Sequence, residues 1–136
     1  MKTFSILLML AISVASAAQS KDKSKPQLTG SDWVLSAVMG SPFKAEMTLS
    51  AIPYIHFSED LKFTGNTSCN NFSGVYNTDK KDISLDPGAM TRKACPVSVE
   101  SQFLDLLKKV KRYYFKKGNL VLQSDDVDEL MIFKVR

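Results

Sequence analysis

Short segments rich in β-branched and aromatic residues alternate with turn residues along most of the chain. Segments of this kind are typical of β-strands joined by short connections. We expect strands at residues 33–38, 44–49, 54–57, 61–64, 72–76, 83–85, 113–115, 120–122 and 130–135. Strands with short links pair antiparallel, so the pattern predicts a sandwich or a small barrel, and a barrel leaves no exposed strand edge.

Three of the connections have the character of β-hairpins. They are FSEDLKF (57–63), YNTDKKDI (76–83) and FKKGNL (115–120). In the third connection, Gly118 and Asn119 are residues that tolerate positive φ. Hairpins at these places would bring six of the predicted strands together as antiparallel pairs.

One segment, VSVESQFLDLLKKVKRYY (97–114), has a different period. Its apolar residues recur every three or four positions and its charged residues take the other face, which predicts an amphipathic α-helix. Phe103, Leu107 and Val110 would pack this helix against the sheet. Ser98 can cap the helix, and Glu100 lies favourably in its first turn. The fold class is therefore mainly β (α+β), a small antiparallel barrel-like sheet packed with one helix.

The N-terminal residues have the pattern of a secretion signal. Lys2 precedes an apolar run at residues 4–14, and small residues follow at 15–18. The run is short for a membrane span, so we expect export and cleavage after Ala17 or Ala18. Residues 1–18 are then a signal peptide, 19–27 a flexible linker and 28–136 one domain. Because no cysteine directly follows the run, we expect a periplasmic or secreted protein without a lipid anchor or a transmembrane helix in the mature form.

The charge balance and the motifs exclude several function classes. The formal net charge is +4, which is too mild to indicate nucleic-acid binding. The sequence has no G-x-S-x-G motif, no Ser/His/Asp set and no phosphate-binding glycine loop. We therefore expect no enzymatic activity, no catalytic residues, no cofactor and no metal.

Cys69 and Cys95 are the only cysteines, and three chemistries compete for them. Zinc needs about four ligands, and adding the lone His56 leaves the set incomplete. A nucleophilic thiolate needs a neighbouring base, yet an exported thiol tends to be oxidised. A disulfide needs only an even count and an oxidising compartment, so we predict a disulfide between Cys69 and Cys95.

The segments around the two cysteines also resemble a known family. GNTSCNNFSGVY (65–76), DPGAMTRKACP (86–96), GNLVLQ (118–123) and ELMIFKV (129–135) are similar to the META domain of HslJ-type heat-shock and envelope proteins. Ser68 stands where that family usually has Gly, and Lys93 stands where Met is common. The resemblance implies a small antiparallel barrel-like fold with one helix, export, and links to heat shock, antibiotic tolerance or secretion. It implies no enzymatic activity.

Polar residues near the cysteines have a structural explanation. We expect Asn70, Asn71, Ser73, Thr91 and Arg92 to satisfy backbone groups in the turns beside the disulfide. A second polar run, at residues 125–129, is acidic but lacks the glycine-punctuated spacing of a calcium loop. We expect a solvated turn there.

A basic and aromatic cluster lies at the end of the predicted helix and in the strand after it. Its residues are Lys108, Lys111, Arg112, Tyr114, Lys116 and Lys117. One interpretation is an ordinary solvated helix end, because lysines suit the negative end of the helix dipole. The other is peripheral contact with an anionic membrane surface.

The function hypothesis that follows is an envelope accessory protein, monomeric, that binds an unidentified protein or small molecule. Two alternatives stay open. A lipocalin-like carrier would hold a small apolar ligand inside the barrel instead of side chains. An inhibitor of a secreted hydrolase would dock a rigid loop into an active site.

Overall fold

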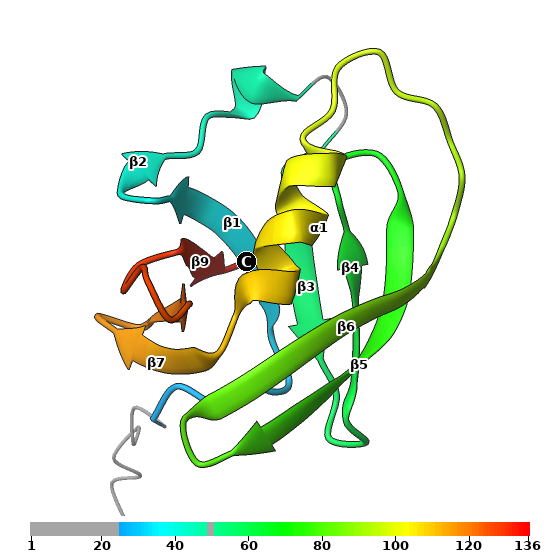
Figure 1. Cartoon of the computed structure of the whole chain (residues 1–136). Coiled ribbons are helices and arrows are strands. Elements are labelled where there is room, and N and C mark those ends of the chain that lie inside the picture. The colour runs from blue at the N-terminus through cyan, green and yellow to red at the C-terminus, as the bar shows by residue number, and fades with distance from the viewer. Residues whose placement is uncertain (1–24, 49–50) are drawn as a thin grey trace, which may run out of the picture.

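The strands within residues 25–48 and 51–136, which the computed structural model of this chain describes, form one antiparallel sheet (Figure 1). They are β1 (Asp32–Val38), β2 (Ser41–Pro42), β3 (Tyr54–Phe57), β4 (Lys62–Asn66), β5 (Asn71–Asp79), β6 (Asp82–Met90), β7 (Arg112–Lys116), β8 (Asn119–Gln123) and β9 (Met131–Val135). The sheet order is β2-β1-β3-β4-β5-β6-β7-β8-β9, and β1 also pairs with β9. The strands other than β2 therefore close into a ring, which confirms the predicted fold class.

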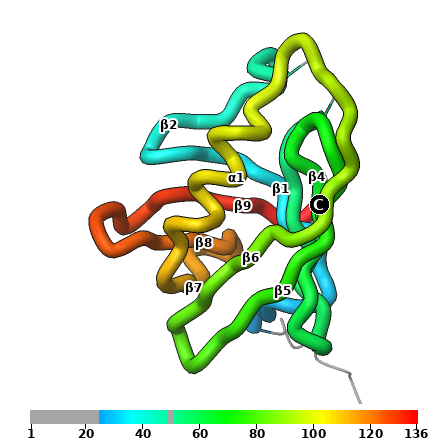
Figure 2. The backbone as a smooth tube through the Cα atoms, turned by 45° about the vertical axis from the view of Figure 1, so that its right-hand side comes forward, coloured from blue at the N-terminus to red at the C-terminus, as the bar shows by residue number. Residues whose placement is uncertain are grey.

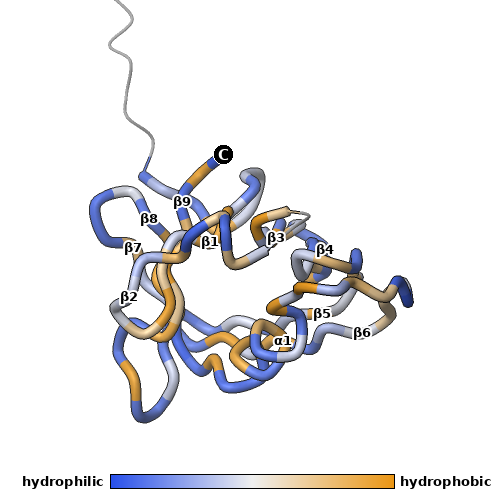
Figure 3. The backbone as a smooth tube through the Cα atoms, turned by 90° about the horizontal axis from the view of Figure 1, so that it is seen from above, coloured by the Kyte–Doolittle hydropathy of each residue, from blue (hydrophilic) through white to orange (hydrophobic). Residues whose placement is uncertain are grey.

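Side chains fill the inside of this ring. Buried and exposed residues alternate along β3, β4 and β5, as expected where one face of a strand meets a core. Figure 3 shows the same change between hydrophobic and hydrophilic positions along the tube. The largest fully buried side chains include Trp33, Phe57, Phe63, Phe103, Phe133, Leu120 and Leu122. Their rings and methyl groups occupy the space that a carrier would keep for a ligand.

The helix α1 (Glu100–Lys109) lies between β6 and β7 in the chain. The predicted face is confirmed, because Phe103, Leu107 and Val110 are each at most 2% exposed. The ring of Phe103 meets that of Phe133 on β9 with centroids 6.4 Å apart. The N-cap position is Val99, one residue later than predicted, although Ser98 Oγ still accepts the Glu100 N–H at 3.0 Å.

The strand predicted at residues 44–49 is wrong. In its place the chain makes the 3₁₀ helix η1 (Ala45–Met47), and residue 49 lies outside the described residues. Met47 N–H donates to Lys44 O at 3.0 Å and Thr48 N–H donates to Ala45 O at 3.1 Å, so local turn bonds replace ladder bonds. Met47 is 51% exposed, so its side chain does not point into the core as a strand residue of the buried face would.

β6 is longer than the predicted strand, since it continues through Asp86-Pro87-Gly88 to Met90. This stretch contains a bulge, because Pro87 and Gly88 of β6 together lie opposite the single residue Gly74 of β5, and the register shifts there. Proline is tolerated at bulges and on edge strands, because no ladder hydrogen bond needs its missing N–H there. The strand therefore continues beyond residue 85, where it was predicted to end.

The three predicted hairpins are present, with one change of detail. They join β3 to β4, β5 to β6 and β7 to β8. In the last hairpin the positive φ angles belong to Lys117 (51°) and Gly118 (81°), whereas Asn119 already begins β8. The acidic run at 125–129 forms the connection between β8 and β9, as predicted.

Around the ring, the strand pairing is shortest between β6 and β7. The only registered pair there is Asp82 with Arg112, flanked by the bonds Ile83 N–H to Lys111 O and Tyr113 N–H to Lys81 O, both 2.9 Å. On the far side of the ring, β2 pairs only with β1, and it extends with η1 toward the start of α1 (Figure 2). Among the described strands, β2, β6 beyond its first residues and β7 beyond its first residues thus lack a strand on one side.

The predicted signal peptide (1–18) and most of the predicted linker (19–27) lie outside the described residues. Burial begins at Leu28, whose carbonyl accepts the Trp33 Nε1–H at 2.8 Å. Within the described ranges, no helix has the length and apolar character that a membrane crossing requires.

Candidate functional site

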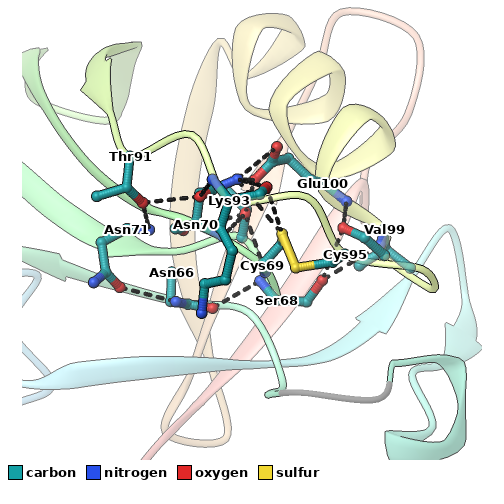
Figure 4. The surroundings of a disulfide bond; sticks show 12 residues. Asn66, Ser68, Cys69, Asn70, Asn71, Thr91, Lys93, Cys95, Val99 and Glu100 are labelled. Carbon is teal, nitrogen blue, oxygen red and sulfur yellow. Dashed lines mark hydrogen bonds between the residues drawn. A yellow bond between two sulfur atoms is a disulfide. The ribbon is translucent and has the colours of Figure 1, made fainter.

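The disulfide between Cys69 and Cys95 joins two separate parts of the chain (Figure 4). Cys69 lies in the turn between β4 and β5, and Cys95 lies in the segment between β6 and α1, with 5.9 Å between their Cα atoms. Cys69 is 6% exposed. Because each sulfur is bonded to the other, neither is present as a thiolate for catalysis or metal binding.

Asn70, beside this disulfide, holds the segment after β6 through its side chain. Its Oδ1 accepts the Lys93 N–H at 2.6 Å and the Thr91 hydroxyl at 2.9 Å. Its Nδ2 donates to Lys93 O at 3.0 Å. Thr91 Oγ1 in turn accepts the Asn71 N–H at 3.1 Å. Asn70 and Thr91 therefore satisfy backbone groups as predicted. The side chain of Asn71 instead accepts from Asn66 Nδ2 at 2.8 Å, and in the described chain those of Ser73 and Arg92 make no hydrogen bond to backbone.

Glu100, at the start of α1, completes the polar cluster. Its carboxylate accepts hydrogen bonds from Asn70 Nδ2, at 3.0 Å to Oε2, and from the Thr67 hydroxyl. Thr67 Oγ1 also accepts the Asn70 N–H at 3.0 Å. Thr67 and Asn70 are buried, at 0% and 3% exposure. A buried network whose members are all partnered gives rigidity to the loops it joins.

Ser68 adopts a conformation that favours glycine. Its φ is 86°, in the left-handed region, where a side chain is strained. Its N–H donates to Asn66 Oδ1 at 2.8 Å, and its Oγ accepts the Val99 N–H at 3.3 Å, just before α1. The hydroxyl thus provides an acceptor for the helix start that glycine could not provide.

An open hollow of about 680 Å³ lies beside this cluster. Its lining comes from Asn70, Glu100 and the stretch from the end of β6 to Ala94, namely Gly88, Ala89, Met90, Thr91, Arg92, Lys93 and Ala94. Most of this stretch is exposed, and three of its side chains are no larger than a methyl group. The hollow therefore presents backbone groups and two cationic side chains to the solvent.

A second, smaller hollow of about 330 Å³ is apolar. It separates the β1–β2 turn and η1 from α1. Its lining includes Val38, Met39, Phe43, Met47, Val99, Phe103 and Leu106. Met39 and Met47 are more than half exposed.

The basic cluster is partly neutralised by the turn between β8 and β9. Arg112 donates from Nε to Gln123 Oε1 at 3.1 Å and lies 3.9 Å from Asp125. Lys116 pairs with Glu129, and this hydrogen bond raises the pKa of the Lys116 ammonium. Lys108, Lys111 and Lys117 are exposed, and Tyr114 is half-buried. Membrane contact by this cluster stays a prediction.

In the described chain, the side chain of His56 pairs with Asp32 and not with either cysteine. Its Nδ1 lies 3.0 Å from Asp32 Oδ1, and Arg136 Nη1 lies 3.3 Å from Asp32 Oδ2. Residues 32 and 56 face one another across the β1–β3 pair. Within residues 25–48 and 51–136, no three His, Cys, Asp or Glu side chains gather as metal ligands.

Sequence reasoning missed two features of this site. It assigned Glu100 only to the first turn of the helix, and it did not anticipate the Asp32–His56 pair. Both depend on which segments lie side by side, and neither has a local signal in the sequence. The Asx-rich loop itself was the detectable signal, because Asn and Thr readily bond to nearby backbone.

The comparisons with known proteins agree with this fold. The model of the META domain matches residues 26–136. A DUF4847 family protein from Bacteroides vulgatus is similar in structure, with a TM-score of 0.59 and 16% identity over 79% of this chain and 93% of that one. A protein from Burkholderia xenovorans gives a TM-score of 0.62 and 21% identity over 80% of this chain and 83% of that one. No curated protein sequence matches the chain significantly.

Proposed function

Because the chain belongs to the META domain family, we propose that it is an exported, non-enzymatic accessory protein of the cell envelope that binds another molecule at its outer surface. The observation that carries this proposal is the contrast between the ring's interior and its exterior. Large buried side chains occupy the interior, and the hollow of about 680 Å³ lies outside, beside the disulfide. Binding at the surface uses the space that this chain leaves open.

Two observations support export. Disulfides persist in oxidising compartments, and the two cysteines of this chain are joined to one another. The N-terminal sequence has the charge, apolar run and small residues of a cleavable signal. Intact-mass measurement on protein recovered from the native envelope would test this. A mass that includes Met1 would refute export by cleavage.

The absence of catalysis is part of the proposal and is supported by how the polar groups are used. The Glu100 carboxylate is held by Asn70 and Thr67, and the thiols are consumed in the disulfide. A general base or nucleophile needs a free lone pair near a substrate. These groups instead fix the position of the loops.

Affinity capture tests surface binding directly. The disulfide-bonded protein is immobilised and exposed to envelope extract, and captured material is identified by mass spectrometry. Ala89→Trp would fill the hollow, and Asn77→Trp on exposed β5 is the matched control. Capture that Ala89→Trp abolishes and Asn77→Trp preserves supports the proposal. Release of a small apolar ligand from the intact protein, in place of a captured surface partner, would refute it in favour of a carrier.

Inhibition of a secreted hydrolase is a second candidate, favoured by the segment from Thr91 to Val99. This exposed segment is fixed at Cys95 by the disulfide and at Lys93 by Asn70. A pre-ordered loop is what an inhibitor inserts into an active site, because little ordering entropy is then lost on binding. Assay of envelope hydrolases with and without the protein would separate the two functions, since an accessory binder leaves their rates unchanged.

A further inference from the structure

The outer edge of β6 lacks a strand partner over most of its length. β6 pairs with β5 along one side, from Asp82 to Met90. On the other side, β7 meets it only at Asp82. Figure 1 shows β6 crossing the front of the molecule and continuing into the loop that returns to α1. Ile83 N–H still donates to Lys111 O on that side, so within the described part of the chain the strand edge runs from Ser84 onward.

The backbone at the end of β6 is oriented for hydrogen bonding on that edge. Thr91 N–H donates to Asn71 O at 3.0 Å, so the backbone groups of Thr91 face β5. Lys93 N–H also points to that side, toward Asn70. Since the backbone groups of successive residues in a strand point to opposite sides, those of Met90 and Arg92 face away from β5. They face the side where the hollow lies.

The hollow keeps this backbone accessible. Gly88, Ala89 and Ala94 contribute small side chains, and the neighbouring Arg92 and Lys93 are exposed. An unpaired strand edge bordered by open space is a template for an added strand. The position of Pro87 in β6 is consistent with an edge, because proline is confined to edges and bulges of sheets.

The charged side chains that line the hollow indicate which kind of partner it would bind. Arg92 and Lys93 have no ion-pair partner among the described residues, while the single carboxylate in the lining, that of Glu100, is bonded to Asn70 and Thr67. The lining therefore carries one net positive charge, with two cations free to interact. Opposite charge in the partner would favour encounter and register.

We propose that the edge formed by the end of β6 and the two residues after it, 88–92, binds an extended, acidic peptide segment of another protein as an added β-strand. This inference rests on the surface-binding function proposed above and names its site and partner class. Backbone bonds at Met90 and Arg92 would supply the affinity, and carboxylates near Arg92 and Lys93 would set the preference.

The test uses the isotope-labelled, disulfide-bonded protein and a short synthetic peptide of alternating glutamate and valine. NMR titration should shift the amides of Met90 and Arg92 and slow their hydrogen exchange. A peptide N-methylated at alternate amides, which cannot form the ladder, should not bind. A peptide with lysine in place of glutamate should bind about tenfold or more weakly.

Variants locate the interaction. Arg92→Glu with Lys93→Glu should weaken binding of the glutamate peptide about tenfold or more, and the equally charged control Lys44→Glu with Lys80→Glu should leave it unchanged. No binding of the peptide, or amide shifts confined to the apolar hollow at residues 39–47, would overturn the β6 proposal. If extract proteins were still captured in that case, the general surface-binding function would stand and only this site and partner class would be wrong.

Discussion

The side chain of Asn70 bonds to both backbone groups of Lys93, with 2.6 Å from Oδ1 to the amide nitrogen and 3.0 Å from Nδ2 to the carbonyl oxygen. The amide of a side chain thereby makes the pair of bonds that a neighbouring strand would make. These two bonds continue the strand-like contact to Lys93, three residues beyond the end of β6 and close to the disulfide.

Asn70→Ala should destabilise the protein by about 1–3 kcal/mol, because it leaves Lys93 N–H and other partners of a buried amide unsatisfied. Denaturant unfolding measures the change. Asn71→Ala is the matched control, since Asn71 is exposed and its side chain bonds only to Asn66 in the described chain. The control should stay within about 0.5 kcal/mol of wild type. Equal effects of the two substitutions would contradict the role given to Asn70.

Ser68→Gly should be more stable than Ser68→Ala by about 1–2 kcal/mol. Both substitutions remove the hydroxyl that accepts the Val99 N–H, so their difference isolates the cost of a side chain at φ 86°. Parallel thermal and denaturant unfolding of the two variants gives this difference. An alanine variant as stable as the glycine variant would show that the left-handed conformation costs nothing here.

Removal of the disulfide by Cys69→Ala with Cys95→Ala should cost about 2–5 kcal/mol. The bond closes a loop between residues separated by 26 positions, which restricts the unfolded chain. Guanidinium unfolding should show a lower midpoint for the variant. A reducing agent should lower the wild-type midpoint toward that value and leave the variant unchanged; a wild type insensitive to reduction would count against the bond.

Phe103→Ala should destabilise the protein by about 3–5 kcal/mol, because the ring is 2% exposed and contacts Phe133. Gln102→Ala, one residue earlier on the exposed side of α1, should change stability by no more than about 0.5 kcal/mol. Denaturant unfolding of both variants tests the assignment of the helix face. A small effect at Phe103 would mean that α1 packs through another face in solution.

The basic cluster should bring the protein to anionic liposomes at low salt and release it at high salt. Exchange of Lys108, Lys111, Lys116 and Lys117 for Glu should abolish co-sedimentation. Exchange of Lys111 and Lys117 alone tests the cluster without disturbing the Lys116–Glu129 pair. Absence of binding at low salt would leave these residues as a solvated helix end.

The sequence predicts the parts of this fold that depend on local patterns. The 3.6-residue period identifies the buried face of α1, because Phe103, Leu107 and Val110 must share one side of any helix that contains them. The hairpins follow from turn residues between apolar runs. The closed ring follows less directly, from the cost of unpaired edges in a sheet of many short strands.

The failures of prediction have two physical origins. Asp86-Pro87-Gly88 has the composition of a turn, yet it stays in a strand beside β5, with a bulge at Pro87 and Gly88 opposite Gly74. A Cβ on Gly74 would lie 2.0 Å from the Asp86 carbonyl oxygen, so the two strands approach closely because residue 74 is glycine. At residues 44–49 the reverse holds, since local turn bonds replace a strand partner. Tertiary contacts, absent from any local window, therefore decide the outcome at residues 86–88, whereas local turn bonds decide it at residues 45–48.

Because β1 pairs with β9, the ring can close only after the C-terminal strand has been synthesised. Trp33 is made early and Val135 late, yet the two are neighbours in the sheet. Hairpins such as β3–β4 and β5–β6 need only nearby residues and can form within microseconds, and β1 can pair with β3 early. The β1–β9 pair, which closes the ring, must wait for residues 131–135 to leave the ribosome. A ring that closes last keeps the growing chain open, which would suit the proposed export, in which the polypeptide is threaded through a membrane before its cysteines are oxidised.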